Sequence, residues 1–366
     1  MKLRVGVVGL GDQWQTRHLP ALRALADRFE IRAVCSQVAE RAIAVAKEFN
    51  ADAVGGFRAV VEREDIDVVL ALAPEWYGPL PILAACDAGK AIFSSASLDV
   101  TPSEALELRE RIEGSGVAFM AELPRRHAPA TVRLKELIAT RLGQPQLLFC
   151  HERLPIEGQS NATRRGDHCP LAWRTMMELA DWCCYLVGDS PESLISTTHS
   201  QSGMQQSPFY QMVSLSFPGQ AAEDGSGGGE KKADPDAEPN AEAGESTDDS
   251  AAVQPLAQLS VGHYIPGKWS DALSFKRPAS IQIRCERGMA FIDLPSSLIW
   301  FDDAGQHTES LEYERPVGEQ MLDRFYRAVT SFIRRTTDPR DAYRAMQIVV
   351  SAAESAATGN RIQLSD

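Results

Sequence analysis

Near its N-terminus the chain reads Val5-Gly6-Val7-Val8-Gly9-Leu10-Gly11-Asp12-Gln13-Trp14. An apolar segment of strand length ends here in closely spaced glycines, and we expect a helix to follow over about 16–29. This order is typical of the first turn of a nucleotide-binding domain, where a pyrophosphate lies at the N-terminus of the helix. Gly9 permits the tight turn, and Gly11 permits a close approach of the backbone to the ligand.

Trp14 stands where such turns carry a third glycine. The third glycine normally lets the helix and the strand pack closely. An indole in this place must therefore point either across the phosphate site or into a displaced helix. Because the glycine pattern alone is weak evidence, the rest of the chain has to support it.

Length and composition describe an ordinary globular protein with 44% hydrophobic and 24% charged residues. A chain of 366 residues favours two domains. No apolar segment reaches the roughly 20 residues that span a bilayer, and the N-terminal apolar segment is not followed by a signal-peptide cleavage site. The seven scattered cysteines contain no Cys-x-x-Cys pair and indicate reduced thiols. We therefore expect a cytoplasmic protein.

The formal charge of −13 is concentrated in one segment. Ten acidic residues and two lysines between positions 223 and 249 contribute −8, which leaves −5 for the rest of the chain. No cluster of basic residues suggests a nucleic-acid partner. Residues 218–253 as a whole are rich in Gly, Ala, Asp, Glu, Pro and Ser, so we expect a disordered acidic insertion. Its role is open.

Strand-like and helix-like segments alternate over residues 1–123. Strands are expected at 30–35, 67–72, 91–93 and 117–120, with helices at 39–49 and 102–113 between some of them. The continuous apolar segment at 67–72 is typical of a parallel strand that is covered on both faces. The pattern predicts a doubly wound parallel sheet, that is, an α/β Rossmann domain.

The pattern changes in residues 124–320. Helices are expected at 129–140 and 171–187, and strands at 146–153, 211–217, 257–264, 280–286, 289–293 and 297–301. Successive strands without helices between them predict an α+β domain with an open, mainly antiparallel sheet. We expect the final helices, at 320–334 and 338–357, to form a C-terminal unit over 321–366 that packs back on the first domain.

Several short motifs recur in one family in this same order. They are Val5 to Gly11, Ala33-Val34-Cys35 with Glu40-Arg41-Ala42, Ile66-Asp67-Val68-Val69 leading to Ala73-Pro74, Ala88-Gly89-Lys90, Arg125-Arg126-His127-Ala128-Pro129, Asp181 with Gly188-Asp189, and Ser355-Ala356-Ala357-Thr358-Gly359. In these motifs the chain resembles the Gfo/Idh/MocA family of NAD(P)-dependent oxidoreductases. The resemblance implies a dehydrogenase acting on a sugar, a polyol or a related hydroxylated metabolite, and a homodimer or homotetramer formed through the second-domain sheet.

The chain departs from this family at its catalytic positions. The usual lysine is replaced by Ala96, within Ser95-Ala96-Ser97, and the usual histidine by Glu178. Removal of a hydride from a carbinol carbon needs a group that takes the hydroxyl proton, and Glu178 is the best candidate for this acid/base role. Arg174, Glu178 and Asp181 are spaced i, i+4, i+7 and form one polar stripe on a helix.

The alternative for Glu178 is an ion pair with Arg174 that only stabilises the helix. Burial would raise the pKa of Glu178 and Arg174 would lower it, so the sequence leaves both interpretations open. Asp181 matches the family and is predicted to lie in the ligand pocket, where Asp181, Arg174 and Arg126 would hold hydroxyl or carboxyl groups of the substrate. The second hypothesis for the whole protein is a catalytically inactive family member that serves as a ligand sensor or an assembly protein.

The resemblance also assigns the remaining site residues. The predicted cofactor contacts are Gly9, Gly11, Asp12, Gln13, Trp14, Ser36, Gln37, Ala73, Pro74, Glu75, Trp76 and Ser95, and the predicted substrate contacts are Arg126 and His127. For His127, a structural role in the Arg125-Arg126 turn is the alternative. Ser36-Gln37 supplies no carboxylate for an adenosine ribose, which tilts the expected cofactor from NAD towards NADP. Arg41 either helps to bind it or is an ordinary solvated arginine. Asp167-His168-Cys169 is a poor ligand set, so no metal is expected.

Overall fold

A parallel sheet occupies the N-terminal third of the chain. The computed structural model describes residues 1–95, 100–156, 171–200, 209–219, 254–266, 269–275, 277–331 and 338–364. Within them the first sheet has six strands in the order β3 (Asp52–Ala53), β2 (Phe29–Cys35), β1 (Leu3–Val8), β4 (Val68–Ala71), β5 (Ala91–Ser95) and β6 (Phe119–Glu122). All of its neighbouring strands are parallel. The predicted doubly wound sheet is confirmed, and its strand order reverses between β1 and β4.

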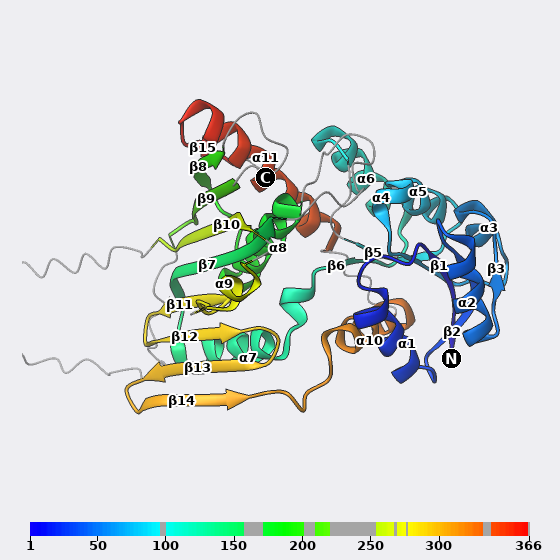
Figure 1. Ribbon diagram of the computed structural model, residues 1–366, viewed down its shortest axis with the longest axis horizontal. Helices are drawn as coiled ribbons and strands as arrows, with labels where there is room; N and C mark the ends of the chain where they lie inside the picture. The colour runs from blue at the N-terminus through cyan, green and yellow to red at the C-terminus, as the bar shows by residue number, and fades with distance from the viewer. Residues whose placement is uncertain are drawn as a thin grey trace, which may run out of the picture.

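Helices connect these strands and cover both faces of the sheet (Figure 1). They are α2 (Ala39–Phe49), α3 (Phe57–Val61), α4 (Pro74–Tyr77), α5 (Leu80–Asp87) and α6 (Pro102–Ser115). Local sequence sets the ends of α6, because Thr101 and Glu104 form a reciprocal capping box and Gly116, at φ +66°, ends the helix. The strands between these helices are apolar because they have no solvent-facing side.

The glycine turn differs from its prediction. In place of one helix over 16–29, a π-helical segment η1 (Trp14–His18) leads into the short helix α1 (Leu19–Ala24). The Trp14 side chain is fully buried in the core of this domain. Of the two orientations that the sequence allows, the indole therefore adopts the one that points into a displaced helix. The π-helical turn is wider than an α-helical turn and occurs where the bulky side chain replaces glycine.

Both glycines of the turn are required by the end of β4. A Cβ atom at Gly11 would lie 2.1 Å from the carbonyl oxygen of Leu72, and one at Gly9 would lie 2.3 Å from the Cβ of Ala73. Gly9 also has φ +83°, in the left-handed region that favours glycine. The turn thus packs directly on the segment that leaves β4.

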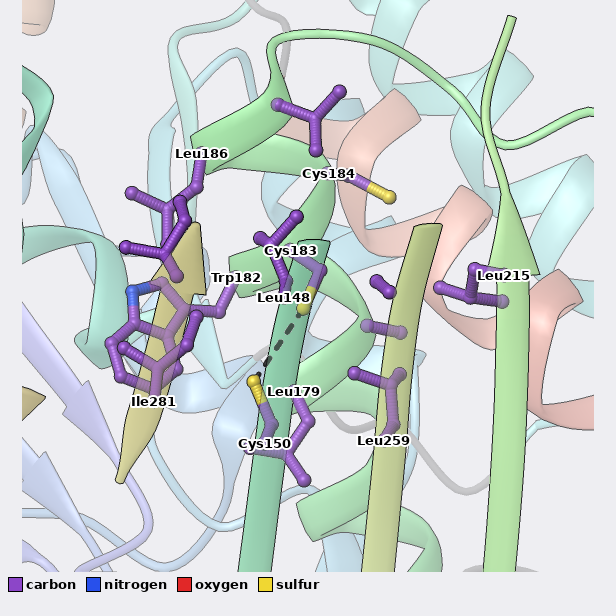
Figure 2. Packing of buried hydrophobic residues seen from close by; sticks show 14 of the residues in the cluster. Leu148, Cys150, Leu179, Trp182, Cys183, Cys184, Leu186, Leu215, Leu259 and Ile281 are labelled. Carbon is purple, nitrogen blue, oxygen red and sulfur yellow. Dashed lines mark hydrogen bonds between the residues drawn. The ribbon is translucent and has the colours of Figure 1, made fainter. Parts of the chain in front are cut away.

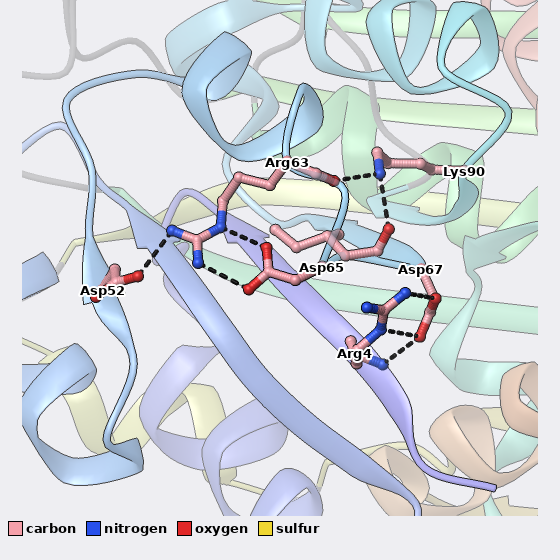
Figure 3. Close-up of polar contacts among 7 residues, drawn as sticks. Arg4, Asp52, Arg63, Asp65, Asp67 and Lys90 are labelled. Carbon is pink, nitrogen blue, oxygen red and sulfur yellow. Dashed lines mark hydrogen bonds and ion pairs between the residues drawn. The ribbon is translucent and has the colours of Figure 1, made fainter.

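Ion pairs and hydrogen bonds stabilise the end of the first sheet that lies opposite the glycine turn, where the strands begin (Figure 3). The guanidinium of Arg4 donates to both carboxylate oxygens of Asp67, at 3.0 and 2.7 Å, which joins the start of β1 to the residue before β4. These bonds lower the pKa of Asp67. The Nζ of Lys90 donates to the carbonyl oxygens of Arg63 and Ile66, both at 2.7 Å. Lys90, one of the residues that carry the family resemblance, therefore has a structural role at the amino ends of the strands.

The second sheet has nine strands within the described residues. Their order is β14 (Gly305–Ser310), β13 (Ser297–Asp302), β12 (Gly288–Asp293), β11 (Ile281–Cys285), β7 (Pro145–Ile156), β10 (Leu256–Pro266), β9 (Phe209–Ser216), β8 (Ser193–Ser200) and β15 (Ile362–Gln363). Among the described strands of this sheet, only β7 and β10 pair in parallel, so the predicted open, mainly antiparallel sheet is confirmed. The prediction did not include β8, β14 and β15, which are short or rich in polar residues and have no continuous apolar pattern.

One face of this sheet is covered by α7 (Pro129–Leu137), the π-helical η3 (Ile138–Leu142) and α8 (Leu171–Val187). Figure 2 shows Leu179, Trp182 and Cys183 of α8 packed on Leu148 and Cys150 of β7. The indole nitrogen of Trp182 donates to the hydroxyl of Thr131 at 3.0 Å, which joins α8 to α7. These contacts hold α8 in one orientation against the sheet.

The two C-terminal helices differ in what they cover. Helix α10 (Val317–Thr330) completes the core of the first domain with Met321, Leu322 and Phe325. Helix α11 (Asp338–Thr358) packs on α8 and β8 of the second domain and also on α6 and β6 of the first. The prediction placed both helices on the first domain, whereas α11 contacts both domains. The predicted insertion at 218–253 lies outside the described residues from position 220 onwards, and no described helix is long and apolar enough to cross a membrane.

Replacing Gly11 with alanine should destabilise the protein by about 2 kcal/mol, because the backbone carbonyl of Leu72 cannot move away from the added Cβ. The matched control is Gly114→Ala, where nothing lies within 4 Å of the added methyl group. That change, inside α6, should raise the free energy of unfolding by about 0.5 kcal/mol. Urea unfolding followed by tryptophan emission measures both, and equal effects would contradict the packing described here.

Candidate functional site

A cleft of about 310 Å³ opens where the glycine turn faces α8. Gly11, Asp12 and Gln13 line it from the first domain. Ser95 and Glu122, the last residues of β5 and β6, contribute to the same wall, in accord with ligand binding at the carboxyl ends of parallel strands. Helices α8 and α11 line the rest, so the cleft has walls from both domains.

Six of the predicted site residues meet in this cleft: Gly11, Asp12, Gln13, Ser95, Arg174 and Glu178. The first four come from the first domain and the last two from α8. The predicted cofactor contacts and the predicted catalytic residues therefore line the same cleft, although they are far apart in the chain.

Other predicted cofactor residues lie elsewhere. Trp14 is buried in the core and does not line the cleft, which corrects its predicted contact with the cofactor. Trp76 packs against Tyr77, with ring centroids 4.1 Å apart. Gly9 and Ala73 pack against each other below the turn. Ser36 and Gln37 follow the carboxyl end of β2. The side chains of Pro74 and Glu75, all of Ala96 and the predicted poor ligand set 167–169 lie outside what the structure describes.

Glu178 does not pair with Arg174. Its carboxylate accepts a hydrogen bond from the Nε of Arg125 at 3.3 Å, and the Nη2 of Arg125 also donates to Glu152 at 3.2 Å. Burial opposes the charge of Arg125, but Glu178 and Glu152 outweigh it and raise the pKa of this arginine. Of the two interpretations left open for Glu178, the ion pair with Arg174 is thus wrong, because a residue far away in the sequence binds the acid instead.

Asp181 and Arg126 are bound to each other outside the cleft. The guanidinium of Arg126 donates to both oxygens of Asp181 and, at 2.7 Å, to Asp341 of α11. Burial raises the pKa of Asp181 to about 6, and the charge of Arg126 opposes this rise. Asp181 is 2% exposed. The predicted roles of Asp181 in the ligand pocket and of Arg126 as a substrate contact are corrected, since the pair joins α8 to α11.

His127 is buried beside this pair. Burial, with the nearby charges of Arg324 and Arg126, lowers its pKa to about 3, so the imidazole is neutral near pH 7. His127 and Arg126 line a separate, open cavity of about 630 Å³ between α7 and α10. The predicted substrate contact through His127 would therefore have to occur in that cavity and not beside Glu178.

Three titratable residues in the cleft, Arg17, His18 and Glu122, were missed by the sequence analysis. The Oε1 atom of Glu122 accepts hydrogen bonds from the Nη1 of Arg17 at 2.6 Å and from the Nε2 of His18 at 3.0 Å. Burial alone would raise the pKa of Glu122, but His18 and Arg17 outweigh it and lower the pKa. The available signal was the position of Glu122 at the carboxyl end of a buried strand, but the expected strand at 117–120 ended two residues too early.

The N-terminal domain matches a family model. Residues 3–123 fit the model GFO_IDH_MocA, described as "Oxidoreductase family, NAD-binding Rossmann fold". The first domain, about a third of the chain, is thus similar to the NAD-binding domain of the Gfo/Idh/MocA family. The match covers the glycine turn and the strand ends that line the first-domain wall of the cleft.

Curated relatives in this family act on sugars and inositol according to their names. The chain is 28% identical over 173 residues to dTDP-3,4-didehydro-2,6-dideoxy-alpha-D-glucose 3-reductase of Streptomyces violaceoruber, over 45% of this chain and 48% of that protein. It is 32% identical over 164 residues to inositol 2-dehydrogenase 3 of Saccharopolyspora erythraea, over 42% and 46%. The chain thus spans about half the length of the curated relatives it matches.

Solved structures share the fold over the whole chain. Levoglucosan dehydrogenase in complex with NADH and levoglucosan superposes with a TM-score of 0.74 at 16% identity, over 100% of both chains. A putative myo-inositol dehydrogenase from Sinorhizobium meliloti gives 0.72 at 17% identity, also over 100% of both chains. At these identities the likeness shows that the chain has the same two-domain fold.

Replacing Glu122 with glutamine should cost about 2 kcal/mol or more of stability, because Arg17 and His18 lose their buried negative partner. Asp87→Asn is the matched control, since Asp87 forms an exposed ion pair with Arg111 and should cost less than about 1 kcal/mol. Urea titrations at pH 7 compare the two. Similar costs would show that the Glu122 cluster is solvated in solution.

Proposed function

We propose that this protein is an NAD(P)-dependent oxidoreductase acting on a sugar, a polyol or a related hydroxylated metabolite. The observation that carries the proposal is the single cleft that joins the glycine turn to Glu178 of α8. Gly11 lines the cleft without a side chain, and the turn lies at the point where the strand order reverses, which fits a dinucleotide phosphate. The cavity is also within the size range of ligand sites.

Within this proposal Glu178 takes the hydroxyl proton of the substrate. The bound nicotinamide supplies the hydride acceptor. The Glu178 side chain is 31% exposed and lines the cleft, so a substrate can reach its carboxylate. The hydrogen bond from Arg125 orients that carboxylate and favours its ionised form, in which it can accept a proton. The usual family lysine is Ala96 in this sequence, which leaves Glu178 as the proposed acid/base residue.

The proposed cofactor preference is NADP. The segment after β2 carries Ser36-Gln37 and no carboxylate that would repel a 2′-phosphate. Arg41 lies close to the same place, since its Nη2 donates to the carbonyl oxygen of Leu10 in the glycine turn at 3.3 Å. A cation at this position would favour the phosphorylated ribose, and the effect should weaken as salt is added.

A second candidate function is ligand sensing or assembly without turnover. The absence of both the usual lysine and the usual histidine from the sequence favours it, as does the engagement of Glu178 by Arg125. Such a protein would keep the cleft and bind the same metabolites without transferring a hydride. Binding and turnover therefore have to be measured separately.

NADPH should bind to the cleft with submillimolar affinity, and NADH more weakly, because Arg41 lies beside the glycine turn. The emission of the reduced nicotinamide, which rises when the ring leaves water, measures both affinities. Gly11→Ala should weaken binding and Gly114→Ala should not. No response to either dinucleotide at millimolar concentration would contradict the proposed cofactor.

Glu178→Gln should lower turnover by about 10²-fold or more, since glutamine cannot accept the hydroxyl proton. Dinucleotide affinity should stay the same. Glu110→Gln, on the exposed side of α6, is the matched control and should leave turnover unchanged. A screen of sugars, polyols and inositols with NAD⁺ and NADP⁺ identifies the substrate for this comparison. Dinucleotide binding without turnover of any of them would favour the second candidate function.

We also propose that the open face of the second sheet binds a second copy of the chain. Leu147 and Phe149 of β7, Ile195 of β8 and Leu256 of β10 are each between 38% and 41% exposed on this sheet. Exposed apolar side chains in such number on one sheet are typical of an interface. A homodimer or homotetramer would cover them.

Phe149→Asp should convert the oligomer to a monomer, because a carboxylate cannot be buried in an apolar interface without a partner. Ile43→Asp is the matched control, since Ile43 is an exposed apolar residue of α2 in the first domain. Size-exclusion chromatography with light scattering gives the mass of each variant. A monomeric wild-type protein would exclude this interface.

A further inference from the structure

Arg174 differs from the other arginines around the cleft. Arg17 is paired with Glu122, and Arg125 with Glu178 and Glu152. Arg174 lines the cleft from α8 and has no ion-pair partner among the residues that the structure describes. Its Nε atom is buried and has no acceptor there. Within the described residues, the guanidinium at the cleft thus has no acidic partner, and its Nε atom has no acceptor.

Comparison with two other arginines of the described chain shows that a guanidinium without any partner is unusual. The Nε atoms of Arg109 and Arg153 are also buried without an acceptor. The guanidinium of Arg109, however, lies 4.7 Å from the ring centroid of Tyr343, and Arg153 donates to the carbonyl oxygen of Phe275 at 3.2 Å. No ring contact or hydrogen bond of this kind involves Arg174 within the described residues.

An unpaired cation in a cleft is unfavourable unless a ligand compensates it. Partial removal of a guanidinium from water costs free energy that only an anion or several acceptors can offset. The nearest acid along the helix, Glu178, lies one turn further on and is held by Arg125. Because Arg125 binds Glu178, this acid does not neutralise the charge of Arg174.

We propose that Arg174 binds a carboxylate of the substrate, so that the substrate is a hydroxy acid of the sugar-acid class and not a neutral sugar or polyol. This inference rests on the proposed function, which it makes more specific. A guanidinium binds a carboxylate through two parallel hydrogen bonds, which fixes the orientation of the ligand.

The position of Arg174 favours the substrate over the cofactor as the source of the anion. Arg174 and Glu178 are four residues apart on α8, and such side chains are neighbours, with about 5–6 Å between their Cβ atoms. The glycine turn, where the dinucleotide phosphates are expected, forms the facing wall of the cleft. A substrate carboxylate on Arg174 would therefore lie close to the hydroxyl group whose proton Glu178 accepts.

Calorimetric titration of the full chain with matched pairs of ligands tests the inference. The pairs are D-glucuronate with D-glucose, D-gluconate with D-glucitol, and L-tartrate with L-threitol. At least one acid should bind about 30-fold more tightly than its neutral counterpart, as expected for hydrogen bonds between charged groups. Arg174→Gln should remove this preference, Arg174→Lys should keep part of it, and the exposed Arg58→Gln should leave it intact.

A second measurement on the wild-type chain does not depend on the folding of any variant. Butanedione, which modifies arginine side chains, should react with Arg174, and mass spectrometry should find it protected by the preferred acid but not by its neutral counterpart. The inference is overturned if no acid binds at millimolar concentration, if Arg174→Gln binds the acids like the wild type, or if NADPH alone protects Arg174 as fully as the acid does.

These outcomes also separate the inference from the proposed function. If an acid binds through Arg174 but neither NADH nor NADPH binds, the oxidoreductase proposal fails and the carboxylate site stands. If a dinucleotide binds and a neutral polyol is oxidised at a rate that Arg174→Gln does not change, the oxidoreductase proposal stands and the carboxylate site fails.

Discussion

A buried guanidinium joins the elements on which the cleft depends. Arg126 follows β6, the last strand of the first sheet, and its side chain binds Asp181 of α8 and Asp341 of α11. The same α8 presents Arg174 and Glu178 to the glycine turn, seven and three residues before Asp181. Three segments that are far apart in the chain are thus bound to one charged group. A buried charge of this kind requires its partners, so the orientation of α8 relative to the first sheet is well determined.

Much of the fold could be predicted from the sequence, because its signals are local. The glycines after Val8 and the apolar strand segments predicted a doubly wound sheet, and α2 and α8 were predicted with the bounds they have in the structure. β8 and β14 were not predicted, since polar residues such as those of Ser193–Ser200 give no apolar pattern. Their position in the sheet is set by pairing with β9 and β13, which is a non-local contact.

The candidate site could be predicted only in part, for the same physical reason. Helical spacing predicted that Arg174 and Glu178 lie on one face of α8, as the cleft shows, but it could not decide whether they pair with each other. Arg125 binds Glu178 from a segment 53 residues earlier in the chain, and no local rule contains that contact. The side chain of Trp14 likewise points away from the cleft and packs in the core of the first domain.

The cleft combines two charged groups with different surroundings. Glu122 is buried, accepts hydrogen bonds from Arg17 and His18, and is suited to hold the first-domain wall in place. Glu178 is more exposed and has one arginine contact, so it remains accessible to a ligand. This division of roles fits the proposed function, in which the first domain binds the dinucleotide and the second domain supplies the acid/base group.

Hydrogen exchange measured by mass spectrometry, with and without NADPH, tests most directly whether the glycine turn and α8 form one site. If they do, the dinucleotide should slow amide exchange both in peptides covering residues 9–18 and in peptides covering the start of α8, at residues 171–180. Protection restricted to the glycine turn, or absent from both regions, would contradict the account that these two elements form a single site.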